Sequence, residues 1–454
     1  MKRSLLFASL LVLLGAVSCT KENINDPDAP GGNDSGSAIV ITSEEAERLP
    51  LLSDNFAVTH EQAEDYARSL VTALNRTGNG TKAFTAVAVI DSIVAETPAT
   101  KSNVQPAKVY VVDMGNGQGY VLTPGDRRVP EKILGYSDEG SFAEGVDIPA
   151  FAYAMECLTD YVAYEIERVE GLRGDSIYMA LCGKLGLDNS SAATKNWGDD
   201  HINEYASVRI VPNGDTWTEL TMIGPLLTTR WSQSHPFNWV LRQQKGNYPV
   251  GCVATAVAQI MNYHKRGTYN GHTYQWANFT SYGVDTEDAL MDLGQLFVDL
   301  GLPSNLNMQY NVDGSGAYST DVPRTFAAFG YTCGNVSSVS GNAINSNIAD
   351  GMPVYASGAN KLGGGAHAWV IDGSEGWHTY QNYTIYYNDR DDRLVHQEVE
   401  TREEGYPSYG GAHCNWGWGG SGDTWLSISA FKPFGYPDKD YSKDNQVIYN
   451  IRPR

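Results

Sequence analysis

Apolar residues recur at helical spacing in two long segments of the first half of the chain. The segments HEQAEDYARSLVTALNR (60–76) and IPAFAYAMECLTDYVAYEIERVEGL (148–172) each carry an apolar stripe along one helical face. Between them, AFTAVAVI, KVYVVDM and GYVLTP are β-branched or aromatic runs, and GNGQG predicts a hairpin turn between the last two. These elements predict a small α+β domain over residues 43–205, in which no catalytic cluster stands out.

A second pattern begins after a polar stretch that is rich in small residues. The stretch LDNSSAATKNWGDDHINEY (187–205) has no periodicity, which is typical of an exposed linker or a cleavable loop. Beyond it, CVATAVAQIMNYHK predicts a helix that begins at Cys252, because YPVG interrupts any regular structure before it. AHAWVIDG predicts a strand that starts beside His367, directly after a glycine-rich turn. We therefore expect a second domain over residues 206–454.

The first 19 residues have the three-part pattern of a secretory signal peptide. A basic pair precedes an apolar run over residues 5–14, and small residues precede Cys19 in AVSC. This ending matches a lipobox, at which Cys19 is lipidated; the alternative is ordinary signal cleavage near Ser18. Residues 20–42 are polar and rich in Gly, Pro, Asn and Asp, which predicts a flexible tether. We expect an exported protein: an outer-membrane lipoprotein, a cell-surface protein or a secreted one.

The charge and the metal-binding residue types exclude several classes of function. The chain carries 53 acidic against 32 basic residues and shows no basic stripe, so we expect no nucleic-acid partner. There is no HExxH motif and the six cysteines form no CxxC pair, so neither a catalytic nor a structural metal, nor any other cofactor, is predicted. Pairing of Cys157 with Cys182, or of Cys333 with Cys414, stays open, although we expect most cysteines to be reduced.

Three residues can together provide a cysteine nucleophile, its base and a group that orients the base. Cys252 in a first helical turn faces the positive end of the helix dipole, which favours the thiolate; the plainer interpretation is a buried core thiol. His367 can take the proton of a thiol, or it can simply bond to backbone. Asn415, in HCNWGWGG, carries an oxygen that can hold the far nitrogen of an imidazole. Trp416 and Trp418 can cover such a bond, or they are ordinary core or surface aromatics.

The segments GCVATAVAQIMNYH, GGGAHAWVIDG and NWGWGG, in this order, resemble the streptopain family of papain-like bacterial cysteine proteases (peptidase family C10). The resemblance covers most of residues 206–454. It implies a papain-like α+β domain that hydrolyses peptide bonds with Cys252, His367 and Asn415. RWSQSHPFN is similar to the family's oxyanion-hole segment, which implies that role for Gln233.

The resemblance also extends to the first domain and to the substrate contacts. GYVLTPGDRRVPEKILGYSDEGSF is similar to the family's propeptide, which implies that the chain is a zymogen inhibited by its own residues 43–205. The cut that releases them is expected in 187–205 or as late as Gly224. Substrate contacts of the family map to Ser315 and to Ala366, where the family commonly has Gly. Our expected substrate-binding set consists of Ser315, Ala366, Trp416 and Trp418.

One departure from the family pattern concerns the distance between the histidine and the asparagine. His367 and Asn415 lie 48 positions apart, whereas the streptopain pattern brings the asparagine much sooner. The excess, from His378 to Gly411, is best interpreted as an inserted hairpin, whose ends still meet. If it interrupts the strand pairing instead, His413 or His378 becomes a rival base.

The sequence therefore predicts a secreted or lipid-anchored zymogen of a cysteine endopeptidase that acts on proteins or peptides. A rival hypothesis is an amidase or transpeptidase that uses the same Cys–His pair on cell-wall peptides. Another is a surface binding protein without turnover, and a third is a module whose first domain remains as a permanent partner.

Overall fold

The structure, a computed structural model, describes most of the chain beyond the predicted tether. Described are residues 43–53, 55–76, 88–94, 108–185, 207–212, 217–359, 366–388, 394–431 and 445–454, with the backbone alone in 88–94, 207–212, 217–220, 377–388 and 394–409. Residues 40–454 form one compact unit. The predicted signal peptide, Cys19, the tether and the linker at 187–205 lie outside the described residues.

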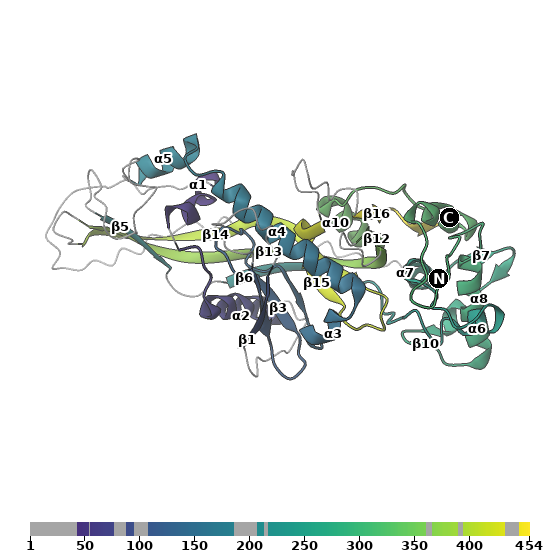
Figure 1. Cartoon of the computed structure of the whole chain (residues 1–454). Helices are drawn as coiled ribbons and strands as arrows, with labels where there is room; N and C mark the ends of the chain where they lie inside the picture. Colours follow the sequence, from purple (N-terminus) through teal and green to yellow (C-terminus); the bar gives the residue numbers. More distant parts are fainter. Residues whose placement is uncertain are drawn as a thin grey trace, which may run out of the picture. The chain divides into compact units, whose positions relative to one another are not determined.

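An antiparallel sheet, eleven-stranded in the described part of the chain, runs through both predicted domains (Figure 1). In spatial order its strands are β1 (Ala88–Val94), β2 (Lys108–Asp113), β3 (Tyr120–Pro124), β4 (Gly135–Ser137), β15 (Thr424–Ser427), β14 (Leu394–Asn415), β13 (Ala366–Asn388), β12 (Val354–Ala359) and β16 (Gln446–Ile448). The two halves of the chain join where β4 pairs with β15, with Tyr136 opposite Trp425 and Gly135 opposite Leu426. We call this pairing the seam.

The helices of the first half cover the two faces of its strands. They are α1 (Ser43–Ala46), α2 (His60–Arg76), α3 (Phe142–Val146), α4 (Pro149–Glu170) and α5 (Ser176–Lys184), with a 3-10 turn η1 (Leu49–Leu52). The apolar face of α2 packs against Val112 and Val121, whereas α4 packs on the alternate residues of the same strands, Val109 and Leu122. The core under α4 also contains Trp369 and Trp416, so it is shared by both halves. The predicted helices and the β2–β3 hairpin are confirmed.

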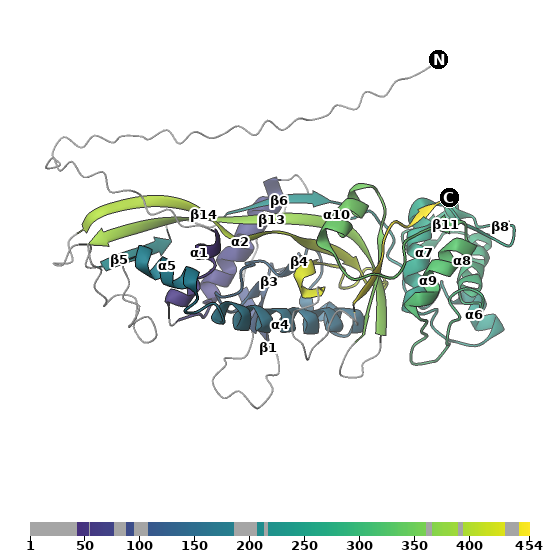
Figure 2. The same cartoon turned by 90° about the horizontal axis from the view of Figure 1, so that it is seen from above.

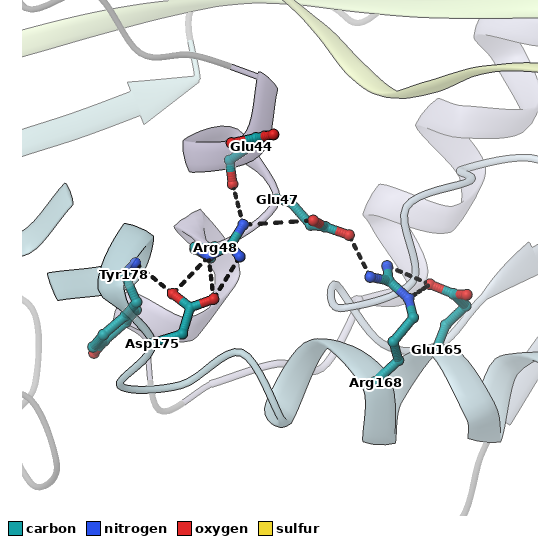
Figure 3. A network of polar contacts seen from close by, with 7 residues as sticks. All are labelled: Glu44, Glu47, Arg48, Glu165, Arg168, Asp175 and Tyr178. Carbon is teal, nitrogen blue, oxygen red and sulfur yellow. Dashed lines mark hydrogen bonds and ion pairs between the residues drawn. The ribbon is translucent and has the colours of Figure 1, made fainter. Parts of the chain in front are cut away.

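A buried arginine fixes the start of the described chain to the helices behind it (Figure 3). The guanidinium of Arg48, a residue only 5% exposed, donates three hydrogen bonds to Asp175, of 3.0, 3.2 and 2.6 Å. Asp175 in turn caps α5 by accepting from the Tyr178 amide at 2.7 Å. Beside this pair, Glu47 forms an ion pair of 2.5 Å with Arg168 of α4. These contacts hold the segment 43–52 against α4 and α5.

Most helices of the second half gather around one buried helix, α7 (Cys252–His264), whereas the last of them, α10 (Gly341–Ala349), packs on strands of the sheet (Figure 2). The others are α6 (Trp239–Gln244), α8 (Glu287–Leu300) and α9 (Val322–Ala328), with 3-10 turns η2 (Trp276–Asn278), η3 (Ser319–Asp321) and η4 (Ile428–Phe431). Three small ladders pair β7 (Thr268–Tyr269) with β8 (His272–Thr273), β9 (Phe279–Thr280) with β10 (Gly283–Val284), and β11 (Tyr331–Thr332) with β17 (Arg452–Pro453). Residues 252–262 of α7 are all buried, including the polar Thr255, Gln259 and Asn262, so the helix is enclosed on every side. The predicted α+β class is confirmed.

The predicted insertion is a long hairpin made of β13 and β14. The two strands pair from Asn388 and Leu394 back to Val370 and Asn415, so the insertion closes on itself as expected. Two further strands, β5 (Ser207–Pro212) and β6 (Trp217–Ile223), pair with β13 along the hairpin. The segment that begins the second half is therefore held in the sheet.

Candidate active site

Cys252 is the first residue of α7, at the point where the helix meets the sheet. Gly251 caps the helix with φ of 91°, a conformation that favours glycine, and a Cβ at this position would lie 2.7 Å from the Ser315 carbonyl oxygen. The backbone of Ala368, the residue after His367, lies close enough to the Cys252 thiol to lower its pKa. The predicted nucleophile and the predicted base are thus brought to neighbouring positions, one from α7 and one from β13.

The Cys252 side chain is 8% exposed. Burial raises the pKa of its thiol, and the backbone of Ala368, Val253 and Cys252 itself lowers it by less. The sequence argument from the helix dipole favoured the thiolate, but here desolvation outweighs it, because a charged sulfur is costly in an apolar core. In this form Cys252 is a neutral thiol at neutral pH.

Asn415 lies at the end of β14, opposite Val370 of β13. Its Oδ1 accepts hydrogen bonds from Gln259 Nε2 at 3.0 Å and from the Gly417 amide at 3.1 Å, and its Nδ2 donates to the Thr229 carbonyl at 2.8 Å. Within the described residues, no hydrogen bond links Asn415 to His367. The structure therefore places Asn415 in the site but bonded to α7 and to the segment before it.

Gln233, the predicted oxyanion residue, belongs to the loop that leads to α6. Its backbone carbonyl accepts a hydrogen bond of 2.9 Å from the Val250 amide, two residues before Cys252. This bond ties the Gln233 loop to the start of α7. The side chain of Gln233 is half-buried.

The predicted substrate contacts lie in different environments. Ser315 is buried against Gly251, and Ala366 is exposed at the first position of β13. Trp416 is completely buried, donates to the Gly422 carbonyl at 2.7 Å and packs against Trp369. Trp418 is 38% exposed. In this form only Ala366 and Trp418 of the four offer substantial surface to a substrate.

Gln259 and Thr229 are residues of the site that the sequence analysis did not name. Gln259 is fully buried on α7, two turns after Cys252, and its Oε1 accepts a hydrogen bond of 2.8 Å from the Thr229 hydroxyl. Its Nε2 holds Asn415, as described above. A polar residue inside the apolar run CVATAVAQIM was the signal, since a buried amide needs partners.

His413, the predicted rival base, is committed to another contact. Its Nδ1 lies 2.6 Å from Asp372 Oδ1, and its ring lies over Trp425. Although burial lowers the pKa of His413, the Asp372 carboxylate raises it to about 9. The hairpin also keeps its strand pairing through Asn415, which was the condition for preferring Asn415. The side chain of His378, the other rival, lies outside the described residues.

Comparison with known proteins agrees with this geometry. The profile of the Peptidase C10 family matches residues 231–426, and the profile of the Spi protease inhibitor matches residues 56–162. Over residues 231–426 the chain is similar to the Peptidase C10 family. It is a streptopain-like cysteine protease with an N-terminal inhibitory propeptide, and the α+β fold expected from that resemblance is the one observed.

Individual relatives of this C10 protease share about a quarter of its residues. Streptopain of Streptococcus pyogenes serotype M1 is 25% identical over 424 residues, which are 85% of this chain and 88% of streptopain. The thiol protease/hemagglutinin PrtT of Porphyromonas gingivalis is 25% identical over 77% of this chain and 37% of its own length. The active wild-type interpain A cysteine protease of Prevotella intermedia is 25% identical over 50% of this chain and 94% of its own, with a TM-score of 0.35.

The C10 protease region and its inhibitor region share a buried polar contact at the seam. The Tyr136 hydroxyl, from β4, donates a hydrogen bond of 2.8 Å to Glu375 Oε2, from β13. Burial raises the pKa of Glu375 to about 8, although Tyr136 and His413 lower it. Glu375 is therefore a neutral acid at neutral pH in the zymogen. Tyr136 also stacks on Trp425 of β15, with 6.1 Å between ring centroids.

The described residues add three observations, on cysteines, metals and membrane spans. Cys157, Cys182, Cys252, Cys333 and Cys414 are all free, so neither of the two disulfide pairings left open is formed. Among the described residues, no group of three or more His, Cys, Asp or Glu side chains is placed to hold a metal ion. No described helix is long and apolar enough to span a bilayer.

Proposed function

We propose that this C10 protease is the exported zymogen of an endopeptidase in which Cys252 is the nucleophile and His367 its base. The observation that carries this proposal is that the Ala368 backbone, next to His367, lies close enough to the Cys252 thiol to lower its pKa. A thiol and an imidazole at neighbouring positions are the pair that a cysteine protease needs.

The reaction follows the usual two steps of acyl transfer. Cys252 gives its proton to His367 and its sulfur attacks the carbonyl carbon of the scissile bond; the C–N bond then breaks as His367 returns the proton to the leaving amine. Water attacks the resulting thioester and gives a proton to His367. The C–S bond breaks, which releases a carboxylic acid and restores the thiol.

Two further roles complete the proposed site. Gln233 is held beside the start of α7 by its bond to Val250, which supports it as an oxyanion donor together with the Cys252 amide. Asn415 is proposed to orient His367 in the mature enzyme. In the zymogen its oxygen is engaged by Gln259 and Gly417, so this role requires a rearrangement when the inhibitor region leaves.

We also propose that the chain is exported and anchored through a lipid on Cys19. The support is the basic, apolar and small-residue pattern that ends in AVSC. Cells that express the chain with and without Cys19→Ser, grown with radiolabelled palmitate, test this proposal. Label on the wild type alone supports lipidation, and label on neither chain contradicts it.

The catalytic proposal is tested by following the size of the chain from Thr20 onward, as wild type and as Cys252→Ala. We expect the wild type to shorten with time and Cys252→Ala to remain intact, because processing needs the nucleophile. If both mature alike, processing by Cys252 is wrong. A chain that stays whole but hydrolyses substrate indicates that the inhibitor region is a permanent partner.

Two substrates distinguish the proposal from its rivals. Hydrolysis of casein supports an endopeptidase, whereas hydrolysis of peptidoglycan fragments alone supports a cell-wall amidase or transpeptidase. A thiol-directed epoxide is expected to label Cys252 in the mature enzyme. A folded mature form that neither turns over substrate nor takes the label is a binding protein.

A further inference from the structure

An ion pair joins the inhibitor region to the protease region close to the candidate site. Arg230 Nη2 lies 2.5 Å from Glu139 Oε1, and the two side chains are 40% and 53% exposed. Glu139 follows β4 by two residues, and Ser137 of β4 donates a hydrogen bond of 3.1 Å to the Asp423 carbonyl. The segment that carries Glu139 is therefore held against the protease region by the seam.

The backbone on both sides of Arg230 is bound to the loop that follows Asn415. The Thr229 carbonyl accepts from Asn415 Nδ2 at 2.8 Å, and the Trp231 carbonyl accepts from the Gly419 amide at 3.0 Å. The Arg230 amide itself donates to the Ser281 carbonyl at 2.7 Å. The backbone of residues 229–231 is thus held on both sides of Arg230, and the same bonds hold Asn415.

The loop after Asn415 also connects the segment 229–231 to the start of α7. A Cβ on Gly417 would lie 3.0 Å from the Thr255 methyl group, one turn after Cys252. A Cβ on Gly420 would lie 2.9 Å from Arg230 Cδ, so the arginine stem lies against the loop backbone. The loop between Asn415 and Gly420 therefore runs from the catalytic helix to Arg230.

The surface around Arg230 has the character of a binding surface. Trp418 in the loop is 38% exposed, and Tyr282, next to the Ser281 carbonyl, is 69% exposed. Exposed aromatics beside an arginine fork are enriched where proteins bind peptides. Asp423 is within electrostatic reach of the guanidinium, but its Oδ1 accepts from the Trp416 amide at 3.0 Å.

We propose that Arg230 is a specificity-determining residue of the mature protease, forming with Trp418 a subsite for an acidic side chain of the substrate. In the zymogen, Glu139 of the inhibitor region occupies this subsite. The inference rests on the proposed function, because it takes the site around Cys252 as the place of peptide hydrolysis.

The chemistry of the pair supports this assignment. A guanidinium presents a planar fork of donors that matches a carboxylate, and it remains charged at any pH at which the protein is folded. Departure of Glu139 leaves this charge facing water beside an exposed aromatic ring. The chain has a net charge of −21, so most of its surface repels an acidic peptide. The exposed guanidinium of Arg230 attracts the carboxylate of such a peptide to this one place.

The test compares peptides that differ only by Glu, Gln or Lys at one position, scanned on both sides of the scissile bond, with the mature enzyme. We expect kcat/KM to be about two- to fivefold higher for Glu than for Gln at one position, the range of a partly exposed ion pair. We expect the preference to come from a lower KM for the Glu peptide, and the difference between the two peptides should shrink with added salt.

Variants then assign the preference to Arg230. Arg230→Ala should hydrolyse the Glu and Gln peptides equally, Arg230→Lys should keep part of the preference, and Arg230→Glu should favour Lys. Arg266→Ala is the matched control, because Arg266 lies just past the opposite end of α7 from Cys252 and should keep the wild-type ratio.

The outcomes separate this inference from the proposed function. If the wild type shows no preference for Glu at any position, or if Arg230→Ala keeps that preference, the subsite is wrong while peptide hydrolysis stands. If Cys252→Ala hydrolyses all peptides as the wild type does, the proposed function is wrong. Melting temperatures of the variants, measured in parallel, show whether each one is folded.

Discussion

Tyr136 of the inhibitor region donates a hydrogen bond of 2.8 Å to the carboxyl group of Glu375 of the protease region, and both side chains are at most 2% exposed. The bond crosses the seam at which the two regions share one sheet. The Glu375 carboxyl group is buried at this junction and its pKa is raised. The free energy of unfolding of the zymogen therefore depends on pH.

The zymogen is expected to lose stability as the pH rises from about 4.5 to about 8. Glu375 has a pKa of about 8 when folded, against 4.5 for the free side chain. A raised pKa gives a contribution that is fully present below the unfolded value and is lost as the pH rises through the folded one, at most about 1.4 kcal/mol per pH unit. Chemical denaturation of the Cys252→Ala chain between pH 5 and 8.5 measures it.

The variant Glu375→Gln isolates this contribution, since it keeps an acceptor for Tyr136 but cannot titrate. We expect the difference in unfolding free energy between the parent and Glu375→Gln to shift in favour of the variant as the pH rises. Although burial lowers the pKa of His413, Asp372 raises it to about 9. His413 therefore contributes a further loss of stability above about pH 6.5, which is the same in both chains. Glu287→Gln, on the surface of α8, is the control. A difference that does not change with pH contradicts the prediction.

Tyr136→Phe is expected to speed the conversion of zymogen to mature enzyme. The change leaves the buried Glu375 carboxyl group without its donor, at a cost of about 1–3 kcal/mol, while the ring stacking on Trp425 is kept. Gel analysis of processing over time measures the rate. Tyr110→Phe is a matched control, because Tyr110 bonds to the Val58 carbonyl inside the inhibitor region. Equal rates for both variants and the wild type argue against a role for the seam contact.

Gly251→Ala is expected to reduce both stability and activity. A Cβ at Gly251 would lie 2.4 Å from Met308 Cε and 2.7 Å from the Ser315 carbonyl oxygen, and φ is 91°. Overpacking of this kind costs about 1–3 kcal/mol, and it shifts the start of α7 that carries Cys252. Gly271→Ala separates the effect of backbone conformation from that of packing. Gly271 also has a positive φ, of 78°, but no atom lies within 4 Å of a Cβ at that position. Gly271→Ala should keep full kcat; if both variants lose activity equally, packing around Gly251 is not the reason.

If Asn415 orients His367 as proposed, Asn415→Ala is expected to lower kcat of the mature enzyme by about tenfold or more, with a shifted pH–rate profile. Gln259→Ala should leave kcat largely unchanged, because the bond of 3.0 Å that Gln259 donates to the Asn415 oxygen has to break before Asn415 can orient His367. Steady-state kinetics and melting curves are compared for both. Loss of stability alone, with kcat and the pH profile unchanged, means that Asn415 is a structural residue.

Local signals were sufficient to predict much of the fold. The helix at 60–76 was predicted from the spacing of its apolar residues, with the bounds that are observed. In the structure Thr59 and Gln62 form a reciprocal cap at its start, in which the Gln62 amide donates to Thr59 at 3.2 Å and the Thr59 amide donates to Gln62 at 3.0 Å. The start of α7 at Cys252 was likewise marked by glycine at 251.

Long-range contacts were not predictable from the sequence. Nothing in the segments around Tyr136 and Trp425 indicates that they pair, because pairing across nearly 300 residues depends on the packed sheet and not on local pattern. The raised pKa of the Cys252 thiol has the same origin: the helix dipole can be inferred from position, but the burial that outweighs it comes from the surrounding core.

The seam has a consequence for the mature enzyme. β15 lies between β4 and β14 in the zymogen, with backbone bonds on both sides. Departure of the inhibitor region uncovers backbone groups of Trp425–Ser427 that β4 and the Leu134 carbonyl had engaged. Each activated molecule therefore acquires a short template for strand addition, on which a released inhibitor, an extended peptide or a second activated molecule competes for the same backbone groups.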